Sequence, residues 1–81
     1  MDGPVQILIV EDDPAIAMIV VEALRDEADA VTTVASIAER DRALAQQLPD
    51  LVITDVVLPD GDGIDSLPPA LTSGDVPVIV L

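Results

Sequence analysis

The sequence predicts an α/β domain built on a parallel β-sheet, and three features support this prediction. Short runs of aliphatic residues alternate with segments of helical periodicity, the order expected for parallel strands joined by right-handed crossovers. The first run is apolar at almost every position, which is typical of a strand covered on both faces. Of the 81 residues, 51% are hydrophobic, so the chain can build one core despite its acidity.

The first predicted strand covers residues 5–10 and ends at an acidic turn. Asp13 followed by Pro14 is typical of a helix N-cap with proline at the first helical position. Apolar residues then recur at helical spacing, and the stripe that we expect to face the core comprises Ile16, Ile19, Val20, Ala23 and Leu24. The first unit is therefore strand, acidic turn and helix.

A second strand is predicted over residues 30–34, followed by a helix over residues 36–48. Ser36 and Glu39 have the spacing of a capping box, in which each residue satisfies a free amide of the first helical turn. Pro49 ends the helix, because the residue before a proline is disfavoured in helical conformation. The apolar face of this helix comprises Ile37, Leu44 and Leu48.

The last part of the chain predicts two more strands, residues 51–54 and 76–81, separated by an interrupted helix. That helix would cover residues 64–71, but Pro68 and Pro69 lie within it. Proline removes an amide donor and clashes with the preceding turn, at a cost of about 3 kcal/mol or more. We therefore expect a short, broken or displaced helix.

The composition excludes several functional classes. The chain has 3 Lys and Arg against 16 Asp and Glu, a net charge of −13, and no His, Cys or aromatic residue. These absences exclude a zinc site, a disulfide framework, a thiol nucleophile and a histidine-based triad. The charge argues against direct contact with nucleic acid or anionic membranes. No apolar run approaches the roughly 20 residues of a membrane span, and we see no secretory signal.

Carboxylates remain as the chemical groups of interest. Glu11 and Asp12 directly follow the strand of residues 5–10, and Asp55 directly follows that of residues 51–54. In open parallel sheets, ligands bind beyond the carboxyl ends of the strands, so adjacent strands would bring the three together. Converging carboxylates repel and need a cation or a proton. The sequence therefore predicts a Mg²⁺ site in which Asp55 can act as an oxygen nucleophile.

Simpler interpretations remain open for the acidic residues. Glu11 and Asp12 can be polar turn residues that compensate the helix dipole. The acidic residues beyond Asp55 are interpreted as solvated turn carboxylates: Asp60, Asp62 and Asp65. The glycines of the loop 56–63 are expected to serve positive φ or tight turns: Gly61 and Gly63.

Sequence motifs of other kinds of binding or catalytic site do not match the spacing of residues in this chain. A dinucleotide fold needs G-x-G-x-x-G after the first strand, where the acidic turn stands instead, and no Walker loop is present. An EF-hand aligned on Asp62-Gly63 would have to begin at Leu58, which is not a ligand. A dehalogenase-like phosphatase would want an aspartate at the position of Val57. An independent carboxylate-metal enzyme is therefore the weaker alternative.

Three blocks together resemble the receiver domain of two-component response regulators. They are I-L-I-V-E-D-D-P (7–14), L-V-I-T-D-V-V-L-P-D-G-D-G (51–63) and V-P-V-I-V-L (76–81). The resemblance covers essentially the whole chain, and the blocks occur in order with fitting separations. It implies a flavodoxin-like, doubly wound parallel sheet, truncated to about four strands in the order 2-1-3-4 with three helices.

The resemblance also implies roles for individual residues. Asp55 matches the phosphoacceptor, and the Mg²⁺ ligands would be Glu11, Asp12, Asp55 and the backbone carbonyl of Val57. The residues that shape the following loop are Leu58, Pro59, Asp62 and Gly63. The phosphodonor would be a phosphohistidine of a sensor histidine kinase or phosphotransfer protein, or a small molecule such as acetyl phosphate. Such a domain only phosphorylates and dephosphorylates itself, works in the bacterial cytoplasm, and switches an interaction face.

The sequence departs from the family pattern at its C-terminal end. We expect residues 1–81 to form a receiver domain that is incomplete there, because the family's Ser or Thr after strand four and its later Lys have no counterpart. The strand of residues 76–81 would then present an apolar edge, which predicts a homodimer through that strand. The alternative function is a receiver-like interaction module that is not phosphorylated in this form.

Overall fold

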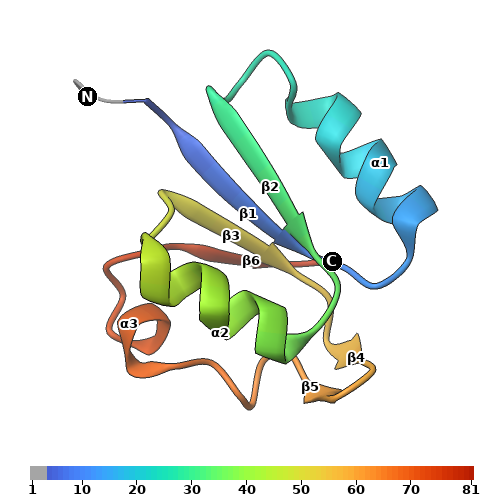
Figure 1. The fold of residues 1–81 in the computed structure, drawn as a ribbon. Coiled ribbons are helices and arrows are strands. Elements are labelled where there is room, and N and C mark those ends of the chain that lie inside the picture. The colour runs from blue at the N-terminus through green and yellow to red at the C-terminus, as the bar shows by residue number, and fades with distance from the viewer. Residues whose placement is uncertain (1–3) are drawn as a thin grey trace.

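A four-stranded parallel sheet in the order β2-β1-β3-β6 forms the centre of the protein (Figure 1). The computed structural model describes residues 4–81. The strands are β1 (Gln6–Val10), β2 (Ala30–Val34), β3 (Leu51–Thr54) and β6 (Val78–Val80). This confirms the predicted α/β class and strand order, with β6 as the fourth strand of the prediction.

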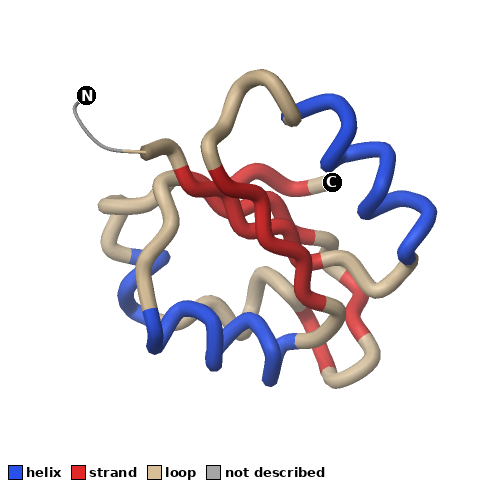
Figure 2. The backbone as a smooth tube through the Cα atoms, turned by 45° about the horizontal axis from the view of Figure 1, so that its top comes forward, coloured by secondary structure: helices blue, strands red, loops and turns tan. Residues whose placement is uncertain are grey.

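The helices cover the sheet on both faces (Figure 2). Helix α1 (Pro14–Leu24) lies on one face, and α2 (Ile37–Gln46) and α3 (Pro69–Thr72) lie on the other. Alternate β1 side chains point to opposite faces, so Ile7 and Ile9 pack on the α1 side while Leu8 and Val10 pack on the α2 side. Within residues 4–81, every helix is too short or too polar to cross a membrane.

Helix α1 buries only part of the predicted stripe, namely Val20 and Leu24. Its core contacts come from Ala17, Val20, Val21 and Leu24, whereas Ile16 and Ile19 are 42% and 68% exposed. The predicted N-cap is confirmed, since Asp13 Oδ1 accepts hydrogen bonds from the amides of Ala15 (2.9 Å) and Ile16 (3.4 Å). The prediction was wrong for Ile16, Ile19 and Ala23, because α1 is apolar almost all round and periodicity alone does not select its buried face.

Helix α2 begins as predicted and ends earlier. Ser36 Oγ accepts from the Glu39 amide at 3.1 Å, and Glu39 Oε1 accepts from the Ala35 amide at 3.2 Å. The helix ends at Gln46 rather than near residue 48, so Leu48 is 49% exposed and does not join the core as predicted. The reason is that the residue before Pro49 is pushed towards extended conformation, and the extended backbone already begins at Gln47.

The region after β3 contains structure that the sequence did not predict. The expected loop 56–63 includes a small antiparallel hairpin, β4 (Val57–Leu58) and β5 (Gly61–Asp62). The interrupted helix is displaced as expected, because residues 63–66 form a turn and α3 begins only at Pro69. Proline is tolerated at that first helical position, where no amide is needed.

Strand β6 lies at one edge of the sheet. Its outer residues Ile79 and Val80, and Leu81 after it, are 50%, 51% and 49% exposed. Paired only with β3 within residues 4–81, it presents an open backbone edge. The homodimer through this strand stays a prediction.

Candidate functional site

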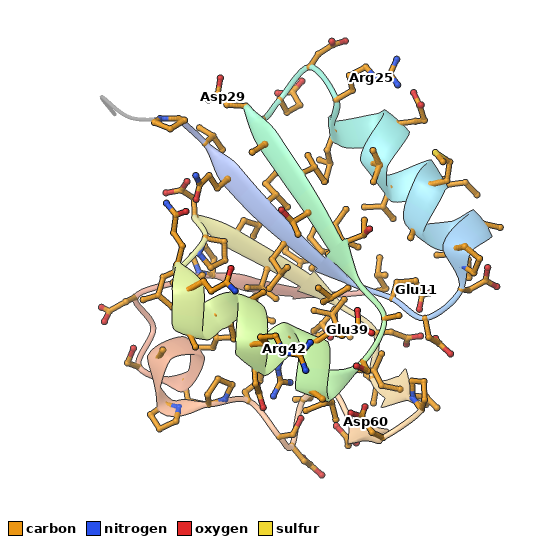
Figure 3. The ribbon with its side chains drawn as sticks, viewed as in Figure 1. Glu11, Arg25, Asp29, Glu39, Arg42 and Asp60 are labelled. Carbon is orange, nitrogen blue, oxygen red and sulfur yellow. The ribbon has the colours of Figure 1, made fainter. Side chains whose placement is uncertain are left out.

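The sheet brings three carboxylates together. Parallel pairing aligns Val10 of β1 with Thr54 of β3, so the residues that follow these strands lie at the same edge. Ligand oxygens of Glu11, Asp12 and Asp55 all lie within 4.8 Å of one another. Figure 3 shows Glu11 at this carboxyl end of the sheet. The predicted convergence is therefore present in the fold.

Backbone hydrogen bonds hold the two strand ends in place. The amide of Asp55 donates to the Val10 carbonyl at 3.0 Å, which continues the β1–β3 ladder by one residue. The amide of Glu11 likewise donates to the Val34 carbonyl at 2.9 Å. The carboxylate of Asp55 is fixed by its own neighbour, since its Oδ1 accepts from the Val56 amide at 2.7 Å. The site thus stands on rigid strand ends rather than on a free loop.

Glu11 is the most confined of the three acids. It is only 5% exposed, and within residues 4–81 its Oε2 is buried without a hydrogen-bond partner. Burial raises the pKa of Glu11 above its usual range, and the adjacent Asp55 and Asp12 carboxyl groups raise that pKa further. A buried carboxylate oxygen without a donor among other carboxylates needs a cation or a proton.

These oxygens fit a hard divalent cation. Three carboxylates with an unpartnered buried oxygen supply the donor type that Mg²⁺ prefers, together with water and phosphate oxygens. The chain has no His or Cys that would favour a softer metal. An acidic cluster of this kind is typical of a receiver Mg²⁺ site.

The loop residues named from the sequence lie in the hairpin and the turn that follow Asp55. Leu58 is buried in the core on the α2 side, and Pro59 lies exposed in the turn between β4 and β5. Asp62 Oδ1 accepts from the amides of Ile64 (2.7 Å) and Asp65 (2.8 Å), so it caps the turn 63–66. These bonds lower the pKa of Asp62.

The two loop glycines serve different purposes. Gly61 has a φ of 145°, as the prediction of positive φ requires. Gly63 has no positive φ and instead begins the tight turn 63–66, the second of the two predicted roles. A side chain at Gly63 would overlap the carbonyl oxygen of Asp55 and come within 3.0 Å of Thr54 Oγ1. Gly63 is needed because the turn packs directly against the backbone of the site.

Comparison with known proteins identifies the family. The response regulator receiver domain profile matches residues 7–81. The chain belongs to this family. Receiver domains are signalling modules, and as a class they work with sensor kinases.

Several relatives show the same similarity. The receiver domain is 43% identical over 67 residues to the probable transcriptional regulatory protein TcrX of Mycobacterium tuberculosis, covering 82% of this chain and 29% of that protein. It is 39% identical over 75 residues to the KDP operon transcriptional regulatory protein KdpE of Escherichia coli, covering 93% and 33%. The chain therefore spans about a third of these curated relatives.

Solved structures agree with this assignment. The MaeR response regulator bound to beryllium trifluoride matches with a TM-score of 0.84 and 37% identity. The match covers 95% of this chain and 66% of that one. It supports the flavodoxin-like receiver fold as well as the family.

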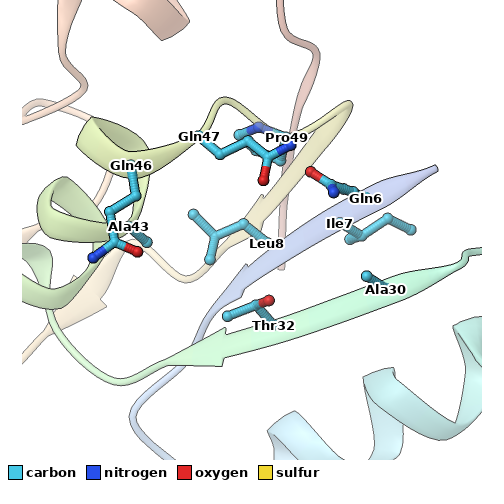
Figure 4. A pocket seen from close by; sticks show the side chains of 9 residues that line it. All are labelled: Gln6, Ile7, Leu8, Ala30, Thr32, Ala43, Gln46, Gln47 and Pro49. Carbon is cyan, nitrogen blue, oxygen red and sulfur yellow. The ribbon is translucent and has the colours of Figure 1, made fainter. Parts of the chain in front are cut away.

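A pocket lies away from the carboxylates, at the amino ends of β1 and β2 (Figure 4). It has a volume of about 440 Å³. Its lining is neutral and comprises Gln6, Ile7, Leu8, Ala30, Thr32, Ala43, Gln46, Gln47 and Pro49. None of these residues is an acid or a base, so this pocket contains no carboxylate cluster like that at the carboxyl end of the sheet.

Sequence reasoning missed two residues near the receiver site. Asp60 was interpreted as a solvated turn carboxylate, but it accepts from the amides of Ile37 (2.8 Å) and Ala38 (3.0 Å) at the start of α2. Figure 3 shows Asp60 beside that helix end. Arg40 of α2 is completely buried and bonds to the turn 63–66. No local pattern signals either contact, because the partners lie 22 to 26 residues away in sequence.

Replacing Asp60 with alanine is expected to lower the melting temperature. The two amide bonds of α2 lower the pKa of Asp60, so the folded protein holds the carboxylate more strongly than the unfolded chain does. The stabilisation is therefore present at neutral pH and is lost as pH falls below about 3.9, through the depressed folded-state pKa. In thermal unfolding, the melting temperature of the wild type should exceed that of Asp60→Ala at pH 7, and this difference should shrink towards pH 3.

A matched variant makes this test specific. Asp65→Ala removes an exposed carboxylate of the neighbouring turn and should leave the melting temperature almost unchanged. An Asp60→Ala difference that stays constant from pH 7 to pH 3 would contradict the capping role.

Proposed function

We propose that this receiver domain accepts a phosphoryl group on Asp55 from the phosphohistidine of a sensor histidine kinase or a phosphotransfer protein. The observation that carries the proposal is the convergence of Glu11, Asp12 and Asp55, with one buried oxygen of Glu11 left without a donor. Phosphorylation then changes an interaction face of the domain. Family membership supports the class of reaction.

The reaction is a transfer between nitrogen and oxygen. A carboxylate oxygen of Asp55 forms a bond to phosphorus as the bond from phosphorus to the imidazole nitrogen breaks. The imidazole keeps the electron pair and takes a proton from water, and Asp55 becomes an acyl phosphate. The hydrogen bond from the Val56 amide to Oδ1 limits rotation of the Asp55 carboxylate. The carboxylate therefore keeps one orientation towards an incoming phosphodonor.

We assign the Mg²⁺ ligands to Glu11, Asp12, Asp55 and the backbone carbonyl of Val57. When bound, the ion would neutralise the carboxylates and the phosphoryl oxygens as negative charge gathers in the site. The residues Leu58, Pro59, Asp62 and Gly63 shape the loop that surrounds Asp55. This assignment rests on the acidic cluster and on the family pattern.

Intact-mass measurement after incubation with Mg²⁺ and acetyl phosphate tests the proposal. The wild type should gain one phosphoryl group, and Asp55→Asn should gain none. Omitting Mg²⁺ should reduce the modification to background. Asp65→Asn serves as the matched control, because it removes an exposed carboxylate close in sequence and should be modified like the wild type.

The same experiment separates the alternative function. A folded chain that gains no mass would favour the interaction module, and modification that survives Asp55→Asn would place the acceptor elsewhere. Beryllium trifluoride, the ligand named for the similar MaeR structure, gives a second readout. With Mg²⁺ it should raise the melting temperature of the wild type but not that of Asp55→Asn.

A further inference from the structure

A buried arginine lies between helix α2 and the turn that follows β5. Arg40 is 0% exposed, although an arginine side chain is rarely fully buried unless it is paired. Its Nε and Nη2 donate to Asp41 Oδ1 at 3.0 and 2.8 Å. Its Nη1 donates to the Gly63 carbonyl at 3.3 Å and to Ser66 Oγ at 3.0 Å, and its Nη2 donates to the Ser66 carbonyl at 2.8 Å.

These bonds use the whole donor set of the side chain. A guanidinium carries five N–H groups, and Arg40 makes five hydrogen bonds. An apolar side chain would fill the same space without the cost of removing a charge from water. Unlike an apolar side chain, the guanidinium donates hydrogen bonds to Gly63 and Ser66, the two ends of the segment 63–66.

The held turn leads directly to the reacting carboxylate. The amide of Gly63 donates to the Val56 carbonyl at 2.7 Å, and the amide of Val56 donates to Asp55 Oδ1 at 2.7 Å. Gly63 also packs so closely against Asp55 that no Cβ fits between them. A continuous path of hydrogen bonds therefore runs from the Arg40 guanidinium through the backbone of Gly63 and Val56 to the Asp55 carboxylate.

We propose that Arg40 is a positioning residue for Asp55, acting through Gly63 and Val56. The guanidinium holds the turn so that Gly63 fixes the Val56 carbonyl and the Val56 amide stays on Oδ1. Without it, the turn can move away from α2, and the Asp55 carboxylate gains rotational freedom. This inference rests on the proposed function for its kinetic consequence, whereas its structural consequence is independent of phosphorylation.

The variants Arg40→Met and Arg40→Lys test the proposal. Methionine keeps much of the length and removes every donor, while lysine keeps the charge but lacks the planar fork that reaches Gly63 and Ser66 together. Leu44→Ala is the matched control for lost stability, because Leu44 is buried one turn later in α2 and packs in the apolar core. Arg42→Met controls for charge, since Arg42 is exposed on the same helix (Figure 3).

Two readouts on the folded protein are compared. The first is the rate constant for phosphorylation by acetyl phosphate at saturating Mg²⁺, corrected for the folded fraction. Arg40→Met should lower it by roughly 10- to 100-fold, as a small misplacement of a reacting group does. The second is the amide proton shift of Val56 by NMR, which reports its bond to Asp55 in the metal-free protein. That resonance should move upfield in Arg40→Met and stay in place in Leu44→Ala and Arg42→Met.

The outcomes separate this inference from the proposed function. An Arg40→Met protein with an unchanged Val56 shift and the same corrected rate as Leu44→Ala would overturn it. A wild type that is not phosphorylated refutes the proposed function, and the Val56 shift then decides the positioning role alone. Should Arg40→Met fail to fold, Arg40→Lys carries the same comparison, with a shifted Val56 resonance expected and an unshifted one decisive against the role.

Discussion

Replacing Gly63 with alanine is expected to destabilise the fold by about 3 kcal/mol, the upper part of the usual range for overpacking. The added Cβ would overlap the Asp55 carbonyl oxygen and lie within 3.0 Å of Thr54 Oγ1. Neither the Asp55 carbonyl nor the Thr54 hydroxyl can move away from the added Cβ easily. The Asp55 amide is bonded to Val10 at 3.0 Å, and Thr54 is fully buried with its hydroxyl on the Asp55 carbonyl at 2.8 Å.

The same substitution should abolish phosphorylation of Asp55 beyond its effect on stability. Relieving the overlap moves either the turn 63–66 or the backbone of Asp55, and both shift the carboxylate relative to Glu11. Urea unfolding measures the change in the free energy of unfolding. Intact-mass measurement under conditions where the variant is still folded measures the extent of phosphorylation.

Gly74 provides the control for this prediction. Its φ of 90° makes alanine strained there, but nothing lies within 4 Å of the added Cβ. Gly74→Ala should therefore lose stability while the folded protein is phosphorylated at the wild-type rate. A Gly63→Ala protein that matches the wild type in both measurements would show that the turn does not depend on this close packing.

Short-range signals predicted much of the fold because they act within a few residues. Asp13 caps the helix that begins next to it, and Ser36 and Glu39 form their capping bonds within one turn. The positions of Glu11 and Asp55 followed from strand ends in a parallel sheet, so the acidic cluster was also predictable. In each case, local chemistry and topology point to the same arrangement.

Other features depend on contacts that no short window contains. The hairpin β4–β5 is too short to show a strand pattern, and it is held to α2 by Asp60, whose partners lie 22 and 23 residues away. An arginine in a helix as polar as α2 is expected at the surface. Arg40 is buried instead, because the carbonyls of the turn 63–66 accept hydrogen bonds from its guanidinium. The buried face of α1 was misplaced because Ile16 and Ile19 are as apolar as the residues that face the sheet.

Replacing Glu11 with glutamine is expected to remove most of the stabilisation that Mg²⁺ gives to the folded protein. A cation that binds only the folded state adds about 2.7 kcal/mol at 100 times its dissociation constant. Glutamine keeps the shape of Glu11 but withdraws one of three charges, and its amide can donate to Asp55 or Asp12. The metal-free variant should therefore be more stable at neutral pH than the metal-free wild type, and it should respond little to Mg²⁺.

The pH dependence gives this prediction a sign. Because the folded-state pKa of Glu11 is raised, the folded protein binds the proton more tightly than the unfolded chain does. Its contribution to stability is complete below the usual glutamate pKa of about 4.3 and is lost as pH rises through the raised value. Asp60 and Asp62 have lowered pKa values, so their contribution to stability is lost only as pH falls below about 3.9. This pH range does not overlap the higher range in which the contribution of Glu11 is lost.

Unfolding curves from pH 4 to pH 8, with a chelator and with Mg²⁺, measure both effects. The metal-free wild type should lose stability as pH rises through this window, whereas Glu11→Gln should lack that loss. The exposed glutamate Glu27, changed to glutamine, controls for the removal of one negative charge and should leave the Mg²⁺ response intact. Equal stabilisation of the wild type and Glu11→Gln by Mg²⁺ would mean that the buried oxygen of Glu11 is not what the cation satisfies. Mg²⁺ would then act through Asp12 and Asp55, and protonation rather than the metal ion would satisfy the buried oxygen of Glu11.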